Sequence, residues 1–147
     1  MTGGQTEKGG LVGKLMVVVG GQFGSEGKGA VTAALAAREE EELAVVRVGG
    51  PNAGHTVWDC KGVEWKLRHI PVAAVVNERA DLYIGPGSEV DCTVLSHELK
   101  ALDEAGYDVF DRLGVDKSAT LLTPDHQDAE ILAGLDKRIG STVKGIG

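Results

Sequence analysis

The chain has 147 residues, of which 42% are hydrophobic and 25% are charged, a composition typical of one globular domain with a sizeable core. Its 15 basic residues stand against 22 acidic ones, so the net charge is −7 and no basic surplus favours a polymeric nucleic acid. The longest aliphatic run, residues 15–19, is far shorter than the roughly 20 residues that span a bilayer, and no signal peptide or cysteine framework is present, so we expect a cytoplasmic protein with no membrane partner.

The first part of the chain predicts a strand, a glycine-rich loop, a helix and a second strand. Residues 1–14 are rich in glycine without an apolar period, and we interpret them as a flexible leader before a domain that covers residues 15–147. The apolar run at 15–19 is typical of a strand buried on both faces of a parallel sheet. Strong helix formers at 30–42 predict a helix, and residues 43–48 predict the strand that completes a βαβ unit.

The second part of the chain predicts further short elements. In chain order they are a hairpin at 57–67, a strand at 80–84, a helix from Asp91 to Gly106, a strand within 113–122 and a helix at 125–139. The hairpin turns at Lys61-Gly62, and the Asp91 side chain is suited to cap the helix that follows it. This alternation of strands and helices predicts an α/β fold with a mainly parallel central sheet.

Two glycine-rich loops carry residues suited to phosphate chemistry. GGQFGSEGKG at 20–29 opens the first helix, where backbone N–H groups and the helix dipole attract an anion that Lys28 can reach. It departs from the strict P-loop pattern, because Gln22 stands in place of a glycine and Gly29 in place of serine or threonine. GGPNAGHT at 49–56 follows the second strand and brings His55 beside the first loop, as a general acid or hydrogen-bond donor. The alternative interpretation is that these glycines only form a tight turn between strand and helix and bind no ligand.

These loops resemble those of the adenylosuccinate synthetase family, and the likeness extends through LRHIP at 67–71, IGPG at 84–87 and GSTVKGIG at 140–147. In that family a nucleoside triphosphate phosphorylates the 6-oxygen of a purine monophosphate, and L-aspartate then displaces the phosphate. The resemblance implies a homodimer that uses Mg2+ and is built from much longer chains. We therefore interpret this chain as the N-terminal part of a synthetase domain, without the aspartate-binding loop and the arginine donated across the dimer.

The resemblance also implies roles for individual residues. The triphosphate site comprises Gly24, Ser25, Glu26, Gly27, Lys28, Gly29, Gly54, His55 and Thr56. The monophosphate site comprises Ser25, Asn52, Ser141 and Thr142. His55 and Ser25 occupy the catalytic positions, and the Gly54 carbonyl and Ser25 occupy the positions of Mg2+ ligands, the ion being one that takes hard oxygen donors.

Ser25 departs from the family, which has an aspartate there that removes the purine N1 proton and binds Mg2+. A serine hydroxyl is a poor base at neutral pH unless it is activated. An inactive relative, a sequence error and a changed substrate are three interpretations of this difference. Serine is shorter and uncharged, so it leaves room for the 2-amino group of guanine, and in this the chain resembles the phage-type branch that acts on dGMP.

The expected function is therefore an ATP-dependent ligase that joins L-aspartate to the 6-position of dGMP, with GTP or dATP as alternative donors. Two other functions stay open. One is the ordinary synthetase reaction on IMP, and the other is nucleotide binding without ligase chemistry.

The remaining histidines, cysteines and tryptophans show no ligand-like spacing. We expect surface or helix positions for His69, His97 and His126, buried thiols at Cys60 and Cys92, and packing rather than base stacking for Trp58 and Trp65.

Overall fold

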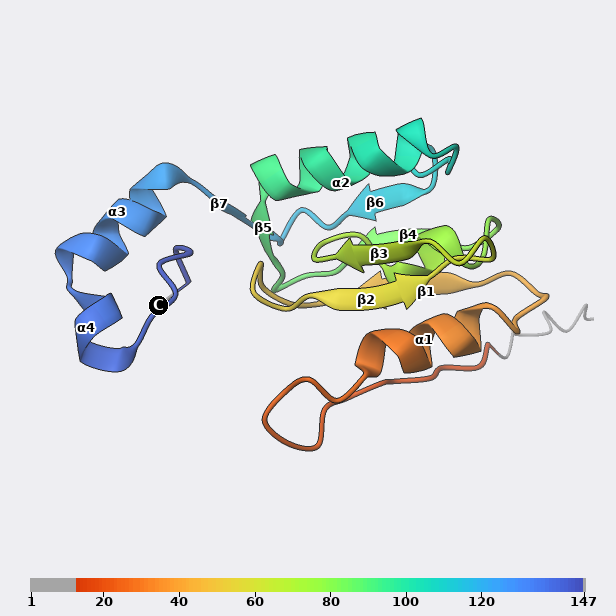
Figure 1. The fold of residues 1–147 in the computed structure, drawn as a ribbon, viewed down its shortest axis with the longest axis horizontal. Helices are drawn as coiled ribbons and strands as arrows, with labels where there is room; N and C mark the ends of the chain where they lie inside the picture. The colour runs from red at the N-terminus through yellow and green to blue at the C-terminus, as the bar shows by residue number, and fades with distance from the viewer. Residues whose placement is uncertain (1–12, 147) are drawn as a thin grey trace, which may run out of the picture.

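The computed structural model describes residues 13–146, and Figure 1 shows an α/β body with a helical arm at its C-terminal end. The central sheet contains β1 (Ala44–Arg47), β4 (Asp81–Ile84) and β6 (Leu113–Val115), in the spatial order β1-β4-β6. Both pairings in this sheet are parallel. The prediction of an α/β fold with a mainly parallel central sheet is confirmed.

Two smaller sheets flank the central one. One is a second parallel pair, β5 (Glu89–Asp91) with β7 (Thr120–Leu122). The other is the predicted hairpin, in which β2 (His55–Trp58) pairs antiparallel with β3 (Glu64–Leu67). Gly62 has a φ of 79° in the connecting turn, a conformation that favours glycine.

Two helices, α1 (Lys28–Ala36) and α2 (Cys92–Glu104), lie on opposite sides of the body, whereas α3 (Pro124–Leu132) and α4 (Leu135–Ile139) form the arm (Figure 1). The 3-10 helix η1 spans Val72–Val75. In Figure 1, α1 lies on the side of β2, and α2 lies on the opposite side, beside β6. The predicted cap of α2 is confirmed, because Asp91 Oδ1 accepts hydrogen bonds from the backbone N–H groups of Thr93 (2.9 Å) and Val94 (3.2 Å).

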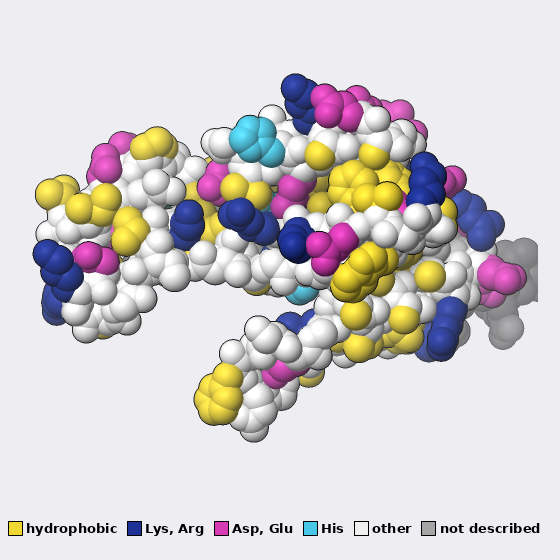
Figure 2. All heavy atoms as spheres, viewed as in Figure 1, with side chains coloured by type: hydrophobic (Ala, Val, Ile, Leu, Met, Phe, Trp, Pro, Cys, Tyr) yellow, Lys and Arg dark blue, Asp and Glu magenta, His cyan; other side chains and the backbone are white. Residues whose placement is uncertain are grey.

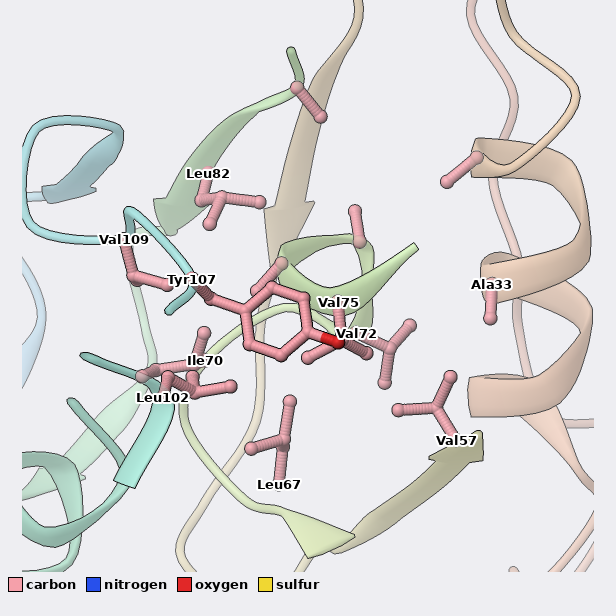
Figure 3. Packing of buried hydrophobic residues seen from close by; sticks show 14 residues of the cluster. Ala33, Val57, Leu67, Ile70, Val72, Val75, Leu82, Leu102, Tyr107 and Val109 are labelled. Carbon is pink, nitrogen blue, oxygen red and sulfur yellow. The ribbon is translucent and has the colours of Figure 1, made fainter. Parts of the chain in front are cut away.

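The core contains Tyr107 at its centre, surrounded by aliphatic side chains from η1, β3, β4 and α2 (Figure 3). The Tyr107 hydroxyl donates a hydrogen bond of 2.7 Å to Asp59 Oδ2, and the indole N–H of Trp65 donates to the same oxygen over 3.1 Å. Asp59 Oδ1 accepts the backbone N–H groups of Lys61 and Val63. One buried carboxylate therefore ties the hairpin turn to the core.

Acid should weaken the fold through Asp59. Hydrogen bonds from Tyr107 and then from Trp65 are the main causes that hold the pKa of this carboxyl below its ordinary value. A depressed pKa in the folded state stabilises the protein above the pKa of the unfolded chain, about 4, and this contribution is lost as the pH falls below it. We expect urea titrations to show a steeper loss of stability below pH 4 for the unmodified protein than for Asp59→Asn. The exposed Asp103→Asn is the matched control and should keep the original pH dependence.

The strand predicted at 15–19 is wrong for the described structure. These residues are extended but belong to none of the sheets, and Leu15, Val17 and Val19 are exposed. An apolar run becomes a central parallel strand only when a neighbouring strand forms hydrogen bonds with it and other elements pack on both of its faces. The outer face of the central sheet is itself open here, with Val46 and Tyr83 exposed, so the βαβ unit lacks its first strand.

Three element boundaries also differ from the predictions. The first helix ends at Ala36 rather than residue 42, because the Asn77 side-chain amide donates to the carbonyl oxygens of Ala36 (2.9 Å) and Glu39 (3.2 Å). The single strand predicted within 113–122 is split into β6 and β7 by a turn in which Asp116 Oδ1 accepts the Ser118 N–H. The last predicted helix is split into α3 and α4 at Gly134, whose φ is 62°.

Several side chains lie elsewhere than expected. His69 is fully buried, and its Nε2 accepts the Asp91 N–H over 3.2 Å, whereas Cys60 and Cys92 are exposed. Trp65 packs against the core as expected, but Trp58 is exposed. Among the described residues, no helix combines the length and apolar character that crossing a membrane requires.

Candidate functional site

The first glycine-rich loop leads directly into the N-terminus of α1. Gly24 and Gly27 have φ values of 92° and 75°, and Ser25 adopts a φ of 54°, which is unusual for a residue with a side chain. The Val31 N–H donates to the Gly27 carbonyl over 3.1 Å. The amides of the first helical turn precede this bond and are the free donors that make a helix N-terminus attract anions.

Lys28 and Glu26 form an ion pair within the loop. Lys28 Nζ lies 2.7 Å from Glu26 Oε2, and Glu26 Oε1 accepts the Gln22 N–H over 2.5 Å. The hydrogen bond from Lys28 and then that from Gln22 lower the pKa of Glu26, so this carboxylate stays charged at neutral pH. Lys28 keeps two of its three N–H donors for an incoming phosphate, while Glu26 shapes the loop that holds it.

The second loop is held by a buried arginine. Arg47, at the end of β1, is 7% exposed, and its Nη2 donates to the Ala53 carbonyl over 2.6 Å. Its Nε and Nη1 have no hydrogen-bond partner among the described residues. Further along the loop, Ala53 N–H donates to the Gly50 carbonyl over 3.1 Å, which curls the backbone toward His55.

His55 packs against the first turn of α1. A Cβ built on Gly29 would lie only 2.8 Å from His55 Cβ, so the two loops approach each other as closely as glycine permits. This contact gives a packing reason for the absence of a P-loop serine or threonine at position 29. Partial burial, followed by the charges of Arg47 and Lys28, lowers the pKa of His55, so its imidazole is neutral at pH 7 and carries one N–H donor.

Gly29→Ala should destabilise the protein, because the added methyl group meets the Cβ of His55. Alanine is favoured over glycine within a helix by about 1 kcal/mol, but overpacking against a fixed neighbour costs about 1 to 3 kcal/mol. We expect a net loss of about 1 kcal/mol in the free energy of unfolding, measured by urea denaturation. Gly54→Ala is the control, since nothing lies within 4 Å of a Cβ built there. A stability gain for Gly29→Ala would contradict the contact with His55.

The two loops enclose a hollow of about 640 Å3. It is lined by Gly24, Ser25, Glu26, Gly27, Lys28, Gly29, Ala30, Asn52, Ala53, Gly54, His55, Thr56 and Trp58. All residues of the predicted triphosphate site therefore line one hollow, together with Asn52 from the predicted monophosphate site. In Figure 2 the projecting first loop and the C-terminal arm leave a notch between them on the face shown.

Of the other predicted monophosphate residues, Thr142 contacts a residue that lines the hollow, Asn52. Asn52 Nδ2 donates to Thr142 Oγ1 over 2.7 Å, although the two residues are 90 positions apart. Thr142 belongs to the segment that follows α4, where Ser141 Oγ accepts the Val143 N–H over 3.2 Å. The structure thus brings Asn52 and Thr142 together, whereas Ser141 is engaged with its own backbone and does not line the hollow.

Two large side chains at the site, those of Arg47 and Trp58, were not predicted. Arg47 had a signal in the sequence, because a charge inside the apolar segment LAVVRV must be paired or functional if that strand is buried. Trp58 had none, since an indole on an alternating strand can face either side of it. The fold and site together define a class, α/β proteins in which a glycine-rich loop opens a helix and faces a second loop across a ligand-sized hollow.

Residues 17–147 match the family model of adenylosuccinate synthetase, and the chain belongs to this family. The adenylosuccinate synthetases of Pyrococcus sp. (strain ST700) and Thermococcus sibiricus are 38% and 39% identical to it, and the matches cover 90% and 89% of this chain. They cover 38% of each relative. The enzyme of Chlorobium chlorochromatii is 38% identical over 89% of this chain and 30% of its own length. The chain spans about a third of the length of these relatives.

Two solved structures share the fold. The fully ligated adenylosuccinate synthetase from Plasmodium falciparum superposes with a TM-score of 0.70 at 27% identity, over 86% of this chain and 29% of its own. The succinoaminodeoxyadenylate synthetase of cyanophage S-2L, bound to dGMP and to dATP as an energy donor, superposes with a TM-score of 0.66 at 32% identity. That match covers 84% of this chain and 33% of the phage enzyme.

Proposed function

We propose that this chain forms the N-terminal, phosphate-binding part of a ligase that joins L-aspartate to the 6-position of dGMP and gives 2-aminodeoxyadenylosuccinate. The observation that carries the proposal is Ser25, which lines the same hollow as His55 and stands where the resemblance implies an aspartate. A short neutral side chain at that point leaves room for the 2-amino group of guanine. The likeness to the phage enzyme, which was solved with dGMP, supports the same substrate.

The proposed reaction has two steps. The 6-oxygen of the purine attacks the γ-phosphorus of the triphosphate, a P–O bond forms, and the nucleoside diphosphate leaves as N1 loses its proton. The amino nitrogen of L-aspartate then attacks C6, inorganic phosphate leaves with the 6-oxygen, and the nitrogen loses a proton. In the first step, Lys28 and the amides that open α1 would bind the transferred phosphoryl group, and the neutral imidazole of His55 would donate a hydrogen bond to it or to the 6-oxygen.

The hollow offers hard oxygen donors for Mg2+, but only one ionised carboxylate. The donors include the Gly54 carbonyl, the Ser25 and Thr56 hydroxyls and the Glu26 carboxylate, which Lys28 already engages. The described residues contain no cluster of three or more acidic, histidine or cysteine side chains that could hold a metal by themselves. This set fits an ion that is bound mainly by the phosphates of the nucleotide, and such an ion would neutralise phosphate charge.

The remaining assignments complete the proposal. ATP is the proposed donor, with GTP and dATP as alternatives, and the active form is a cytoplasmic homodimer in which further sequence, equivalent to the rest of the longer relatives, binds L-aspartate. Asn52 and Thr142 bind the monophosphate, since their side chains already meet at the rim of the hollow. Ser141 is proposed as a further contact to it.

The ordinary synthetase reaction on IMP is the second candidate function. It is favoured by the sequence relatives, because the archaeal and Chlorobium proteins that match over about 90% of this chain are all adenylosuccinate synthetases. The two functions differ in the substrate and in how the N1 proton is removed.

The test is phosphate release by the active ligase with ATP and Mg2+, measured with dGMP or IMP and with or without L-aspartate. The proposal expects release that requires both dGMP and aspartate, with a higher kcat/KM for dGMP than for IMP. A preference for IMP would establish the second candidate. Release that does not depend on aspartate would indicate a nucleotide-binding relative without ligase chemistry.

A further inference from the structure

Arg47 is a buried arginine that takes part in none of the ion pairs between described residues. It lines a cavity of about 130 Å3 with Lys28 and His55, and none of the described residues that line this cavity is acidic. Burial lowers the pKa of its guanidinium despite the opposing charge of Glu98, and both oxygens of Glu98 already accept backbone N–H groups of residues 68–70. Because a buried charge is costly unless it is paired, Arg47 requires a reason other than its contribution to stability.

A second arginine shows how this chain satisfies a guanidinium that has a structural role. Arg112 donates to four backbone carbonyl oxygens, those of residues 74, 77, 80 and 108. Arg47 is more deeply buried than Arg112, but it donates to a single described acceptor, the Ala53 carbonyl, and its Nε and Nη1 have no partner among the described residues. The hydrogen bonding of Arg47 is therefore directed at one peptide of the second glycine-rich loop.

The backbone of Arg47 is fixed to the central sheet, so its side chain can hold the loop in place. The Arg47 carbonyl oxygen accepts the Gly85 N–H over 2.8 Å and the hydroxyl of the buried Ser88 over 3.3 Å. At the other end of the residue, Nη2 lies 2.6 Å from the Ala53 carbonyl oxygen. Short hydrogen bonds from a charged donor are among the stronger ones in proteins. One side chain therefore joins the sheet to the loop between β1 and β2.

The loop between β1 and β2 has few hydrogen bonds of its own. Among the described residues, the Ala53 N–H donates to the Gly50 carbonyl over 3.1 Å and the Gly54 N–H donates to the Asn52 carbonyl over 3.2 Å. Glycines also cost more conformational entropy to order than other residues. The Ala53 carbonyl belongs to the planar peptide that leads to Gly54, and Asn52 precedes it. Holding this carbonyl therefore orients both neighbours, which line the hollow.

We propose that Arg47 is a positioning residue of the ligase, which acts through Ala53 to hold the second glycine-rich loop in the conformation that binds the purine monophosphate. The inference rests on the proposed function, because that function assigns Asn52 to the monophosphate. A loop that is ordered before the ligand arrives binds it without the cost of ordering. The hydrogen bonds that shape the triphosphate loop, between Glu26 and its partners Gln22 and Lys28, do not involve Arg47.

The kinetic test is a difference between two Michaelis constants of the active ligase. Arg47→Met removes the guanidinium and keeps an unbranched side chain. We expect the KM for the monophosphate to rise about tenfold and kcat to fall at least about tenfold, while the KM for the triphosphate stays within about twofold. Arg47→Lys keeps a charged donor and should recover part of both losses. The assay uses whichever of dGMP and IMP the enzyme prefers, so the choice between them does not affect the result.

Arg112→Met is the matched control, because the hydrogen bonds of Arg112 involve neither glycine-rich loop. It should lower the urea midpoint at least as much as Arg47→Met and leave both KM values within about twofold of the original. A selective rise in the KM for the monophosphate in Arg112→Met would overturn the inference, since general destabilisation would then explain the effect. An equal rise in both KM values in Arg47→Met would also overturn it.

Hydrogen exchange tests the loop without the reaction. In the ligand-free protein, the amides of residues 52–54 should exchange at least about tenfold faster in Arg47→Met than in the unmodified protein, whereas those of residues 99–104 in α2 should exchange at the same rate. Unchanged exchange in the loop would overturn the positioning role.

The failure of this inference is distinguishable from the failure of the proposed function. If the unmodified enzyme shows aspartate-dependent phosphate release but Arg47→Met leaves the KM for the monophosphate unchanged, the role of Arg47 is wrong and the ligase function stands. If the unmodified enzyme shows no such release with either nucleotide, the proposed function is wrong, and this inference is wrong with it.

Discussion

Lys28→Ala should lower the kcat/KM of the active ligase by about a hundredfold, which corresponds to about 3 kcal/mol of lost transition-state stabilisation. Lys28 stands at the first position of α1, beside the free amides of the helix N-terminus. In the proposed reaction it would supply positive charge to the transferred phosphoryl group. The side chain is two-thirds buried, so its charge is screened less by water than that of an exposed lysine. In the variant, solvent compensates poorly for the lost charge. The measurement is steady-state phosphate release with saturating aspartate.

Lys100→Ala is the matched control, because it removes the same charge from an exposed position on α2, where Lys100 Nζ lies 3.7 Å from Glu104. Its kcat/KM should stay within about twofold of the original value, since exposed ion pairs contribute little. A loss below about threefold for Lys28→Ala would mean that the loop does not hold the transferred phosphate. The fold and family would then stand, but the assignment of the phosphoryl site would not.

Ser25→Asp should shift the preference of the enzyme from dGMP toward IMP by at least about tenfold in relative kcat/KM. In the proposed function, the carboxylate would occupy the space that serine leaves for the 2-amino group and would supply a base for the N1 proton. The backbone at position 25 has a φ of 54°, a region that aspartate enters more readily than most residues, so the substitution fits the loop. The assay compares kcat/KM for dGMP and IMP in both proteins.

Ser25→Ala distinguishes the effect of side-chain size from the effect of the hydroxyl group. It leaves the same space for the 2-amino group and removes only the hydroxyl. We expect it to retain the preference for dGMP. In the unmodified enzyme the rate with dGMP should rise with pH as N1 of guanine approaches ionisation, since Ser25 provides no carboxylate, and this slope should flatten in Ser25→Asp. An unchanged preference for dGMP in Ser25→Asp would refute the role of Ser25 in substrate choice.

The elements that the sequence predicted well are those with strong local signals. The hairpin turn at Gly62, the Asp91 cap and the stop at Gly106 each depend on the chemistry of one or two residues, and each is confirmed. The turn from the glycine-rich loop into α1 was also identifiable, because a helix start, clustered glycines and Lys28 are contiguous in sequence. Local chemistry of this kind needs no knowledge of the tertiary fold.

The features that escaped prediction depend on distant partners. The end of α1 is decided by Asn77, 41 residues beyond Ala36. The segment at 15–19 has the composition of a buried strand. A buried strand also requires a hydrogen-bonded neighbouring strand and packing on both faces, and composition does not indicate whether these are present. The burial of His69 and the exposure of Trp58 likewise follow from packing, and no single-residue preference distinguishes them.

The hydrogen bond between Asn52 and Thr142 joins the C-terminal arm to the second glycine-rich loop. The proposed monophosphate site therefore depends on where the arm lies. Pairing of β5 with β7 fixes the chain as far as Leu122, and α3 and α4 fill most of the segment between that pairing and Thr142. The Asn52–Thr142 hydrogen bond contributes about 1 kcal/mol to docking of the arm, and Ile146 lies beside Gly50 as a further contact. In the proposed function, a monophosphate that binds both residues would favour the docked arm, and its observed affinity would be its intrinsic affinity multiplied by the docked fraction.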